Sequence, residues 1–244
     1  MLESGFYNMD CMDGMAQFSD KFFDLAIVDP IYGDVKAGGY MNGKSAGGVG
    51  PHPKYNYGIW SQKKTDQSYF NELFRVSKNQ VIWGGNYFAL MLRKNSPCWI
   101  VWDKCNGDTN WADFEMAWTS FDGAARIFRY MWNGMLQGKS ISEGHIMQGD
   151  KSRNEVRIHP TQKPVALYKW LLSNYADPGD KILDTHVGSA SSLIACHQMG
   201  FHCWGFEIDP DYYKSATERL EKSKAQVSLF DRPTQQLQQI RLEE

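Results

Sequence analysis

Three short apolar runs in this chain each end at an acidic residue, and this pattern constrains the fold more than any other feature. The runs are Leu25–Val28 before Asp29, Lys181–Leu183 before Asp184, and His202–Phe206 before Glu207. Apolar runs of this length are typical of buried strands. Because open α/β sheets bind ligands at the carboxyl ends of their strands, we expect these acids to border a binding site.

The remaining apolar segments alternate between helical and strand-like spacing. Helices are predicted at residues 66–77, 165–175 and 189–198, and further strands at 80–83, 98–102 and 114–118. This alternation of strand and helix predicts an α/β fold, with a Rossmann-like, mostly parallel sheet and helices on both faces.

The length of 244 residues and a hydrophobic content of 42% suit one domain, residues 1–244, with one sizeable core. Two irregular segments interrupt it, a glycine-rich basic loop at 33–64 and an insert at 122–158. A polar tail follows at 225–244. Five cysteines without a Cys-x-x-Cys pair suit a reducing cytoplasm. No apolar segment is long enough to span a membrane, so no membrane partner is expected.

The segment Asp29-Pro30-Ile31-Tyr32 can hold a planar amine. A nucleobase amine is a poor nucleophile inside a duplex, so an enzyme must flip the base into a pocket. The Asp29 carboxylate and the Pro30 carbonyl can accept hydrogen bonds from the amine, and the Tyr32 ring can stack on the base. An ordinary strand-to-turn transition is the alternative interpretation of this short motif.

The segment after Asp184 predicts a nucleotide-type cradle. Gly188 permits a close approach of the backbone, and the following helix presents free N–H groups. About twenty residues later Glu207 ends the next strand, where an acid commonly binds ribose hydroxyls. A purely structural strand-helix-strand unit is the alternative.

With these motifs, the segments His159-Pro160-Thr161-Gln162-Lys163-Pro164 and Gly205-Phe206-Glu207-Ile208-Asp209 resemble the β-class DNA N6-adenine and N4-cytosine methyltransferases. The order of motifs is also that of the class, with the amine motif before the cofactor motif. The resemblance covers most of the chain and implies a class I methyltransferase fold in circularly permuted order, with S-adenosylmethionine as cofactor.

The same resemblance implies roles for individual residues. Asp10 would lie near the cofactor adenine, Glu207 at the ribose and Asp184 at the methionine end. The other residues expected to line the cofactor site are Asp29, Thr161, Lys163, His186, Gly188 and Ser189. Asp29, Pro30 and Tyr32 would be the catalytic residues.

Two departures from the family pattern affect these expectations. Ile31 stands where the family usually has a second proline, which leaves the loop less rigid. The family usually has Asp-Pro-Phe-x-Gly-Ser-Gly where this chain has Asp184-Thr185-His186-Val187-Gly188-Ser189-Ala190. His186 therefore stands at the position of the phenylalanine and Ala190 at that of the last glycine. We interpret His186 as a ring in the pocket wall that could alter cofactor affinity, because no second ligand has a spacing suited to a metal.

The net charge of −2 is unevenly distributed. Residues 34–64 hold five lysines and one acid, and residues 123–164 hold seven basic and three acidic residues, so each segment is positive. Such segments can neutralise phosphates of double-stranded DNA, although solvated loops would have a similar composition. We assign Lys36, Arg126, Arg129 and Tyr32 to the DNA substrate, since the 122–158 insert occupies the family's position for target recognition.

The sequence thus predicts a site-specific DNA methyltransferase that modifies the N6 amine of adenine. Adenine is preferred because the motif begins with Asp29, whereas N4-cytosine members more often begin with serine. The alternatives are an N4-cytosine enzyme, a catalytically silent DNA- or cofactor-binding relative, and an RNA or protein amine methyltransferase. A homodimer is left open, and no restriction subunit is evident in this chain.

Overall fold

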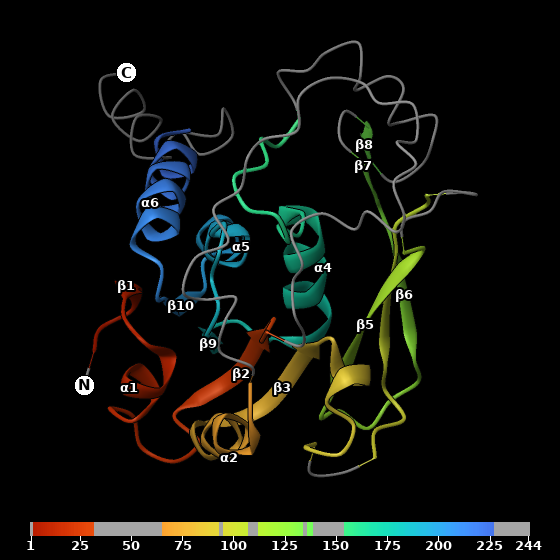
Figure 1. Cartoon of the computed structure of the whole chain (residues 1–244), viewed down its shortest axis with the longest axis vertical. Coiled ribbons are helices and arrows are strands. Elements are labelled where there is room, and N and C mark those ends of the chain that lie inside the picture. The colour runs from red at the N-terminus through yellow and green to blue at the C-terminus, as the bar shows by residue number, and fades with distance from the viewer. Residues whose placement is uncertain are drawn as a thin grey trace, which may run out of the picture.

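The computed structural model describes residues 2–31, 65–92, 95–106, 112–133, 136–138 and 154–226. Its centre is an eight-stranded sheet in the order β1-β10-β9-β2-β3-β5-β4-β6 (Figure 1). The strands are β1 (Gly5–Asn8), β2 (Phe23–Val28), β3 (Ser77–Trp83), β4 (Ile100–Asp103), β5 (Phe114–Thr119), β6 (Arg126–Arg129), β9 (Lys181–Asp184) and β10 (His202–Glu207).

Helices cover both faces of this sheet, as predicted. The α-helices are α1 (Cys11–Met15), α2 (Gln67–Val76), α4 (Val165–Tyr175), α5 (Ser191–Met199) and α6 (Pro210–Ala225). In Figure 1, α1 and α2 lie on one side of the strands, whereas α4, α5 and α6 lie on the other. The α/β class and the mostly parallel sheet with helices on both faces are therefore confirmed.

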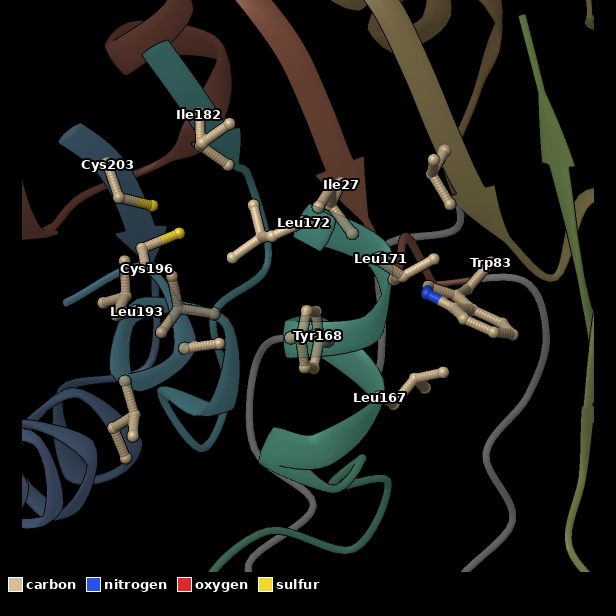
Figure 2. Close-up of a cluster of buried hydrophobic side chains, with 14 of the residues drawn as sticks. Ile27, Trp83, Leu167, Tyr168, Leu171, Leu172, Ile182, Leu193, Cys196 and Cys203 are labelled. Carbon is tan, nitrogen blue, oxygen red and sulfur yellow. The ribbon is translucent and has the colours of Figure 1, made fainter. Parts of the chain in front are cut away.

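Two hydrophobic cores form because successive strand residues point to opposite faces. On β2, Leu25 and Ile27 belong to the core under α4 and α5, and Ala26 and Val28 to the core over α1 and α2. On the first face, Leu171 of α4 lies toward Trp83 of β3 (Figure 2). Strand β2 is thus buried on both faces, which fixes the position of the residues that follow it.

The helices begin at recognisable caps. Asp66 caps α2 by accepting hydrogen bonds from the backbone N–H groups of Ser68 and Tyr69. Asp209 caps α6 in the same way, and Pro210 occupies the first helical position, where its missing N–H has no cost. Helix α5 begins at Ser191, two residues later than predicted, because the loop after β9 extends to Ala190.

The sheet departs from strict alternation of strand and helix. Strands β1, β10, β9, β2 and β3 form parallel neighbours, but β5 is antiparallel to both β3 and β4. Strands β4 and β5 are sequential and pair directly, and β6 then pairs in parallel with β4. The prediction of continuous strand-helix alternation was wrong in this half, because two antiparallel strands need no helical crossover.

The described part of the 122–158 insert is more regular than its composition suggests. After β6, the strands β7 (Met131–Asn133) and β8 (Leu136–Gly138) pair as a two-stranded antiparallel sheet. The Trp132 indole N–H donates to the Gln162 carbonyl oxygen at 2.9 Å, so this insert packs against the His159–Pro164 segment. Residue 32, the glycine-rich loop at 33–64 and the tail beyond Gln226 lie outside the described residues.

None of the helices in the described ranges is both long enough and apolar enough to cross a membrane.

Candidate active site

A cavity of about 560 Å³ lies where β1, β2, β9 and β10 end at their carboxyl side. Every acid-bearing strand end predicted from the sequence contributes to this region. The cofactor and catalytic candidates that line the cavity are Asp10, Asp29, Pro30, Thr161, Lys163, His186, Gly188, Ser189 and Glu207. The fold therefore brings together residues from both ends of the chain.

Asp29 lies directly after β2, with its side chain 14% exposed. Its Oδ2 forms a short ion pair with the Lys163 ammonium, whereas its Oδ1 is buried and has no hydrogen-bond partner among the described residues. Burial raises the pKa of Asp29, and the neighbouring Lys163 opposes this rise. One carboxylate oxygen is thus available to accept a hydrogen bond from a ligand.

Ile31 and Thr65 stand on either side of residues 32–64, and both line the cavity. The Thr65 N–H donates to the Ile31 carbonyl oxygen at 3.3 Å, so these two flanking residues meet beside the cavity. The roles predicted for Tyr32 and Lys36 fall within that segment, outside the described residues.

The loop after β9 wraps one side of the cavity. Gly188 has φ +54°, a conformation that glycine adopts without strain, and a Cβ atom there would lie 3.5 Å from the His159 ring. Ala190 has φ +62° although it carries a side chain. Ala190 occupies the position of a glycine in the family pattern. A left-handed backbone costs an alanine about 1 kcal/mol more than a glycine, and the loop keeps this geometry nonetheless.

Asp184 does not border the cavity, although the sequence placed it among the cofactor ligands. It is 2% exposed, its Oδ1 accepts from the His186 N–H at 3.0 Å, and its Oδ2 accepts from the Ser192 hydroxyl. Burial raises the pKa of Asp184 to about 7. Asp184 therefore joins the two ends of the loop, and its direct contact with a cofactor stays a prediction.

His186 is held by a chain of polar contacts that the sequence did not indicate. Its Nδ1 lies 2.9 Å from the Thr185 hydroxyl, which also lies 2.6 Å from the Tyr69 hydroxyl of α2. Burial lowers the pKa of His186 to about 4. The ring is neutral at physiological pH, which suits an uncharged wall of the cavity.

Glu207 ends β10 and connects two loops. Its Oε2 accepts from the Gly188 N–H at 2.8 Å, and its Oε1 accepts from the Asp209 N–H at 2.9 Å. Burial raises its pKa. Each oxygen has a further lone pair, so the carboxylate can also accept hydrogen bonds from ligand hydroxyls.

The His159–Pro164 segment forms a compact turn before α4. The Gln162 side chain accepts from the Ile158 N–H at 2.9 Å and donates to the Val156 carbonyl oxygen at 3.1 Å. Thr161 lies at the cavity with its hydroxyl 3.2 Å from the His159 Nδ1. Lys163 is 3% exposed and points at Asp29.

Asp10 caps α1, with its Oδ1 accepting from the Met12 N–H at 2.8 Å, and it lies beside the cavity. Arg126 and Arg129 lie elsewhere, on the edge strand β6, with exposed side chains. Arg129 pairs with Asp103 at 3.2 Å. Neither arginine lines the cavity, so any contact of these side chains with DNA would be made at the edge strand β6.

A second cavity of about 190 Å³ lies beyond the end of β3. Its walls include Gly84, Asn86, Lys104 and Glu115, and Tyr87 borders both this cavity and the larger one. Gly84 and Asn86 follow β3 and Lys104 follows β4, so the ends of both strands border this cavity. The sequence did not indicate Glu115, because a charged residue within an alternating strand is most often solvated.

No group of three or more histidine, cysteine or acidic residues suited to a metal occurs among the residues that the structure describes.

A family model described as DNA methylase, covering N6 and N4 methyltransferases, matches residues 93–218, slightly more than half of the chain. The chain belongs to this DNA methylase family. The match includes β5, the His159–Pro164 segment, the loop after β9 and Glu207, but begins after Asp29.

Two curated relatives agree with this DNA methylase assignment over short stretches. The type II methyltransferase M.HpaI of Haemophilus parainfluenzae is 35% identical over 77 residues, 32% of this chain and 24% of the relative. The DNA adenine methyltransferase YhdJ of Escherichia coli K12 is 37% identical over 68 residues, 28% of this chain and 23% of the relative. The matched stretch thus spans about a quarter of each relative's length.

A solved structure extends the similarity of this DNA methylase to the whole fold. The crystal structure of an M1.HpyAVI complex with S-adenosylmethionine has a TM-score of 0.52 and 19% identity, and the match covers 88% of this chain and 98% of that one. At this identity the comparison supports the shared class I methyltransferase fold.

Proposed function

We propose that this DNA methylase transfers the methyl group of S-adenosylmethionine to an exocyclic amine of a base in double-stranded DNA, with the N6 amine of adenine as its target. The observation that carries the proposal is the buried Oδ1 of Asp29, which has no hydrogen-bond partner among the described residues and lies in the same cavity as Glu207 and the Gly188 loop. A buried acceptor without a partner is costly, and such atoms are found where a ligand completes them.

The residues of the cavity fit the proposed cofactor. A volume of about 560 Å³ lies within the usual range for small-ligand sites. Glu207 offers lone pairs to ribose hydroxyls, and the positive φ of Gly188 keeps the loop backbone close to the space it encloses. Asp10, the N-cap residue of α1, also lines the cavity and is our candidate for the adenine end.

The cofactor would supply an electrophilic methyl group and leave as S-adenosylhomocysteine. Asp29 would accept a hydrogen bond from the target amine through Oδ1, and the Pro30 carbonyl would accept the second. These contacts direct the nitrogen lone pair at the methyl carbon, so the N–C bond forms in line as the S–C bond breaks. The amine proton is lost to solvent after transfer.

The choice of adenine as the target base comes from the amine motif. The amine motif begins with Asp29, which favours adenine by resemblance, but the matching family includes both N6 and N4 enzymes. N4-cytosine is therefore the second candidate, and the same experiment decides between them.

The experiment is nucleoside mass spectrometry of unmethylated double-stranded DNA after incubation with protein and S-adenosylmethionine. We expect N6-methyladenine with the wild type and none with Asp29→Asn, which preserves the side-chain volume. The control Asp177→Asn changes an exposed aspartate and should retain full activity. N4-methylcytosine instead would change the base but keep the mechanism, whereas an active Asp29→Asn variant would contradict it.

A further inference from the structure

Lys163 lies between two carboxylates at the edge of the active site. Its ammonium pairs with the Asp29 Oδ2 and lies 3.0 Å from the Glu115 Oε2. Its side chain is 2% exposed, and the Trp83 ring lies beneath it at 5.4 Å. A buried ammonium needs such partners, because its desolvation otherwise costs several kcal/mol.

Glu115 belongs to β5 and holds a second cation. Its Oε1 pairs with the Lys104 ammonium at 2.6 Å, so each of its two oxygens binds one lysine. Burial alone would raise the pKa of Glu115, but the two lysines outweigh it and hold the value at about 2. Glu115 is therefore an anion at neutral pH and gives the Lys163 ammonium a second carboxylate partner besides Asp29.

The two oxygens of the Asp29 carboxylate therefore have different surroundings. Oδ2 faces the Lys163 ammonium, and Oδ1 is buried without a hydrogen-bond partner in the described part of the chain. Without the lysine, burial and the nearby Glu115 charge would both favour the neutral acid. A protonated Asp29 would be a weaker acceptor for an amine.

We propose that Lys163, clamped by Glu115, is a positioning residue for methyl transfer: it keeps Asp29 in the carboxylate form and leaves Oδ1 directed at the target amine. This inference rests on the proposed function and deepens it, because it gives Lys163 a role towards the amine site. The sequence had placed Lys163 with the cofactor.

Other titratable groups around Asp29 do not replace this lysine. Within the described ranges, Lys163, Glu115 and Lys104 act electrostatically on Asp29, and Asp29 in turn acts on a second set, Tyr69, Tyr168 and Asp184. Burial raises the pKa of both tyrosines well above the ordinary value, so they remain neutral. Lys104 is the other cation of the first set, and it is paired with Glu115.

The first test is the pH dependence of kcat for Lys163→Met and Glu115→Gln. Activity should rise with pH as Asp29 loses its proton. In Lys163→Met this rise should move upward by about one pH unit or more, since the stabilising cation is gone. In Glu115→Gln kcat should fall, because Lys163 loses one of its two anchors, but the rise should not move upward, because a repelling anion is removed.

The matched control is Lys78→Met, which removes a lysine from the exposed 2.6 Å ion pair with Asp24, outside both cavities. It should leave the pH profile unchanged. A purely structural role for Lys163 predicts lower thermal stability with an unshifted profile, and that result would overturn the proposal.

A second measurement does not depend on turnover. The protonated carboxyl band of Asp29 can be followed by infrared difference spectroscopy against Asp29→Asn, in the wild-type and Lys163→Met backgrounds. A higher titration midpoint in Lys163→Met supports the proposal, and an equal midpoint overturns it. If the wild type methylates no DNA while this midpoint shifts, the proposed function has failed but the role of Lys163 in setting the charge of Asp29 has not.

Discussion

The Glu207 carboxylate accepts a hydrogen bond from the Gly188 backbone N–H at 2.8 Å, across 19 residues of chain. This contact joins the end of β10 to the loop after β9. Because the second carboxylate oxygen accepts from the Asp209 N–H, Glu207 fixes both segments before any ligand binds. The proposed ribose site is therefore preorganised by the same residue that would hold the ribose.

Replacing Glu207 with glutamine should weaken cofactor binding. The variant keeps the volume but loses the charge and one acceptor, which is worth about 1.5 to 3 kcal/mol for hydrogen bonds to a charged group. We expect the Kd for S-adenosylmethionine to rise by about tenfold or more, measured by calorimetry. Glu221→Gln, on the exposed face of α6, is the matched control. An unchanged Kd in Glu207→Gln would rule out the assigned role.

The substitution Gly205→Ala should displace the loop that follows β9. A Cβ atom at this position of β10 would lie 2.7 Å from the Val187 Cγ2 and 3.0 Å from the Leu193 Cδ2. Overpacking of this kind costs about 1 to 3 kcal/mol, and the displaced Val187 would shift the adjoining Gly188 amide. A lower Tm together with weaker cofactor binding is expected.

Gly123→Ala provides the comparison for this substitution, because its Cβ atom would meet only the Cys98 Sγ, at 3.8 Å. Equal losses of stability in the two variants would show that the contact with Val187 is not the cause.

Asp184→Asn should stabilise the protein at high pH. The folded pKa of about 7 lies above the ordinary value of 3.8, so the folded state retains a proton that the unfolded state releases. Wild-type stability therefore falls as pH rises between these values, and the asparagine variant escapes this loss. We expect its advantage to grow to about 4 kcal/mol by neutral pH, because each pKa unit corresponds to about 1.4 kcal/mol.

Thermal unfolding at several pH values measures this effect, with the exposed Asp177→Asn as control. The prediction fails if the difference in stability between Asp184→Asn and the wild type does not depend on pH.

Arg126→Ala and Arg129→Ala should each weaken DNA binding in a salt-dependent way. Both side chains are exposed on β6, outside the cavities, where they can contact phosphates. Each substitution should reduce the slope of log K against log salt concentration by about one. Lys214→Ala on α6 serves as a comparison, and slopes equal to the wild type would remove both arginines from the DNA surface.

The sequence by itself determined the elements and the chemistry at their ends. Apolar runs and helical spacing predicted β2, β3, β9, β10, α2 and α4 to within a few residues, because these patterns arise from local backbone geometry. The sequence also predicted a binding site at the strand ends, because parallel strands expose their carboxyl ends at one edge of the sheet. The cavity is lined there by Asp29, Gly188 and Glu207.

Only the tertiary structure decided which side chains meet. Lys163 and Asp29 are 134 residues apart, and the contact of Lys163 with Glu115 depends on β5 pairing antiparallel beside β3. The hydrogen bonds of Asp184 to His186 and Ser192, and its place outside the cavity lining, likewise come from the folded loop. Strand order and side-chain direction arise from packing between distant segments, and no local pattern of residues encodes them.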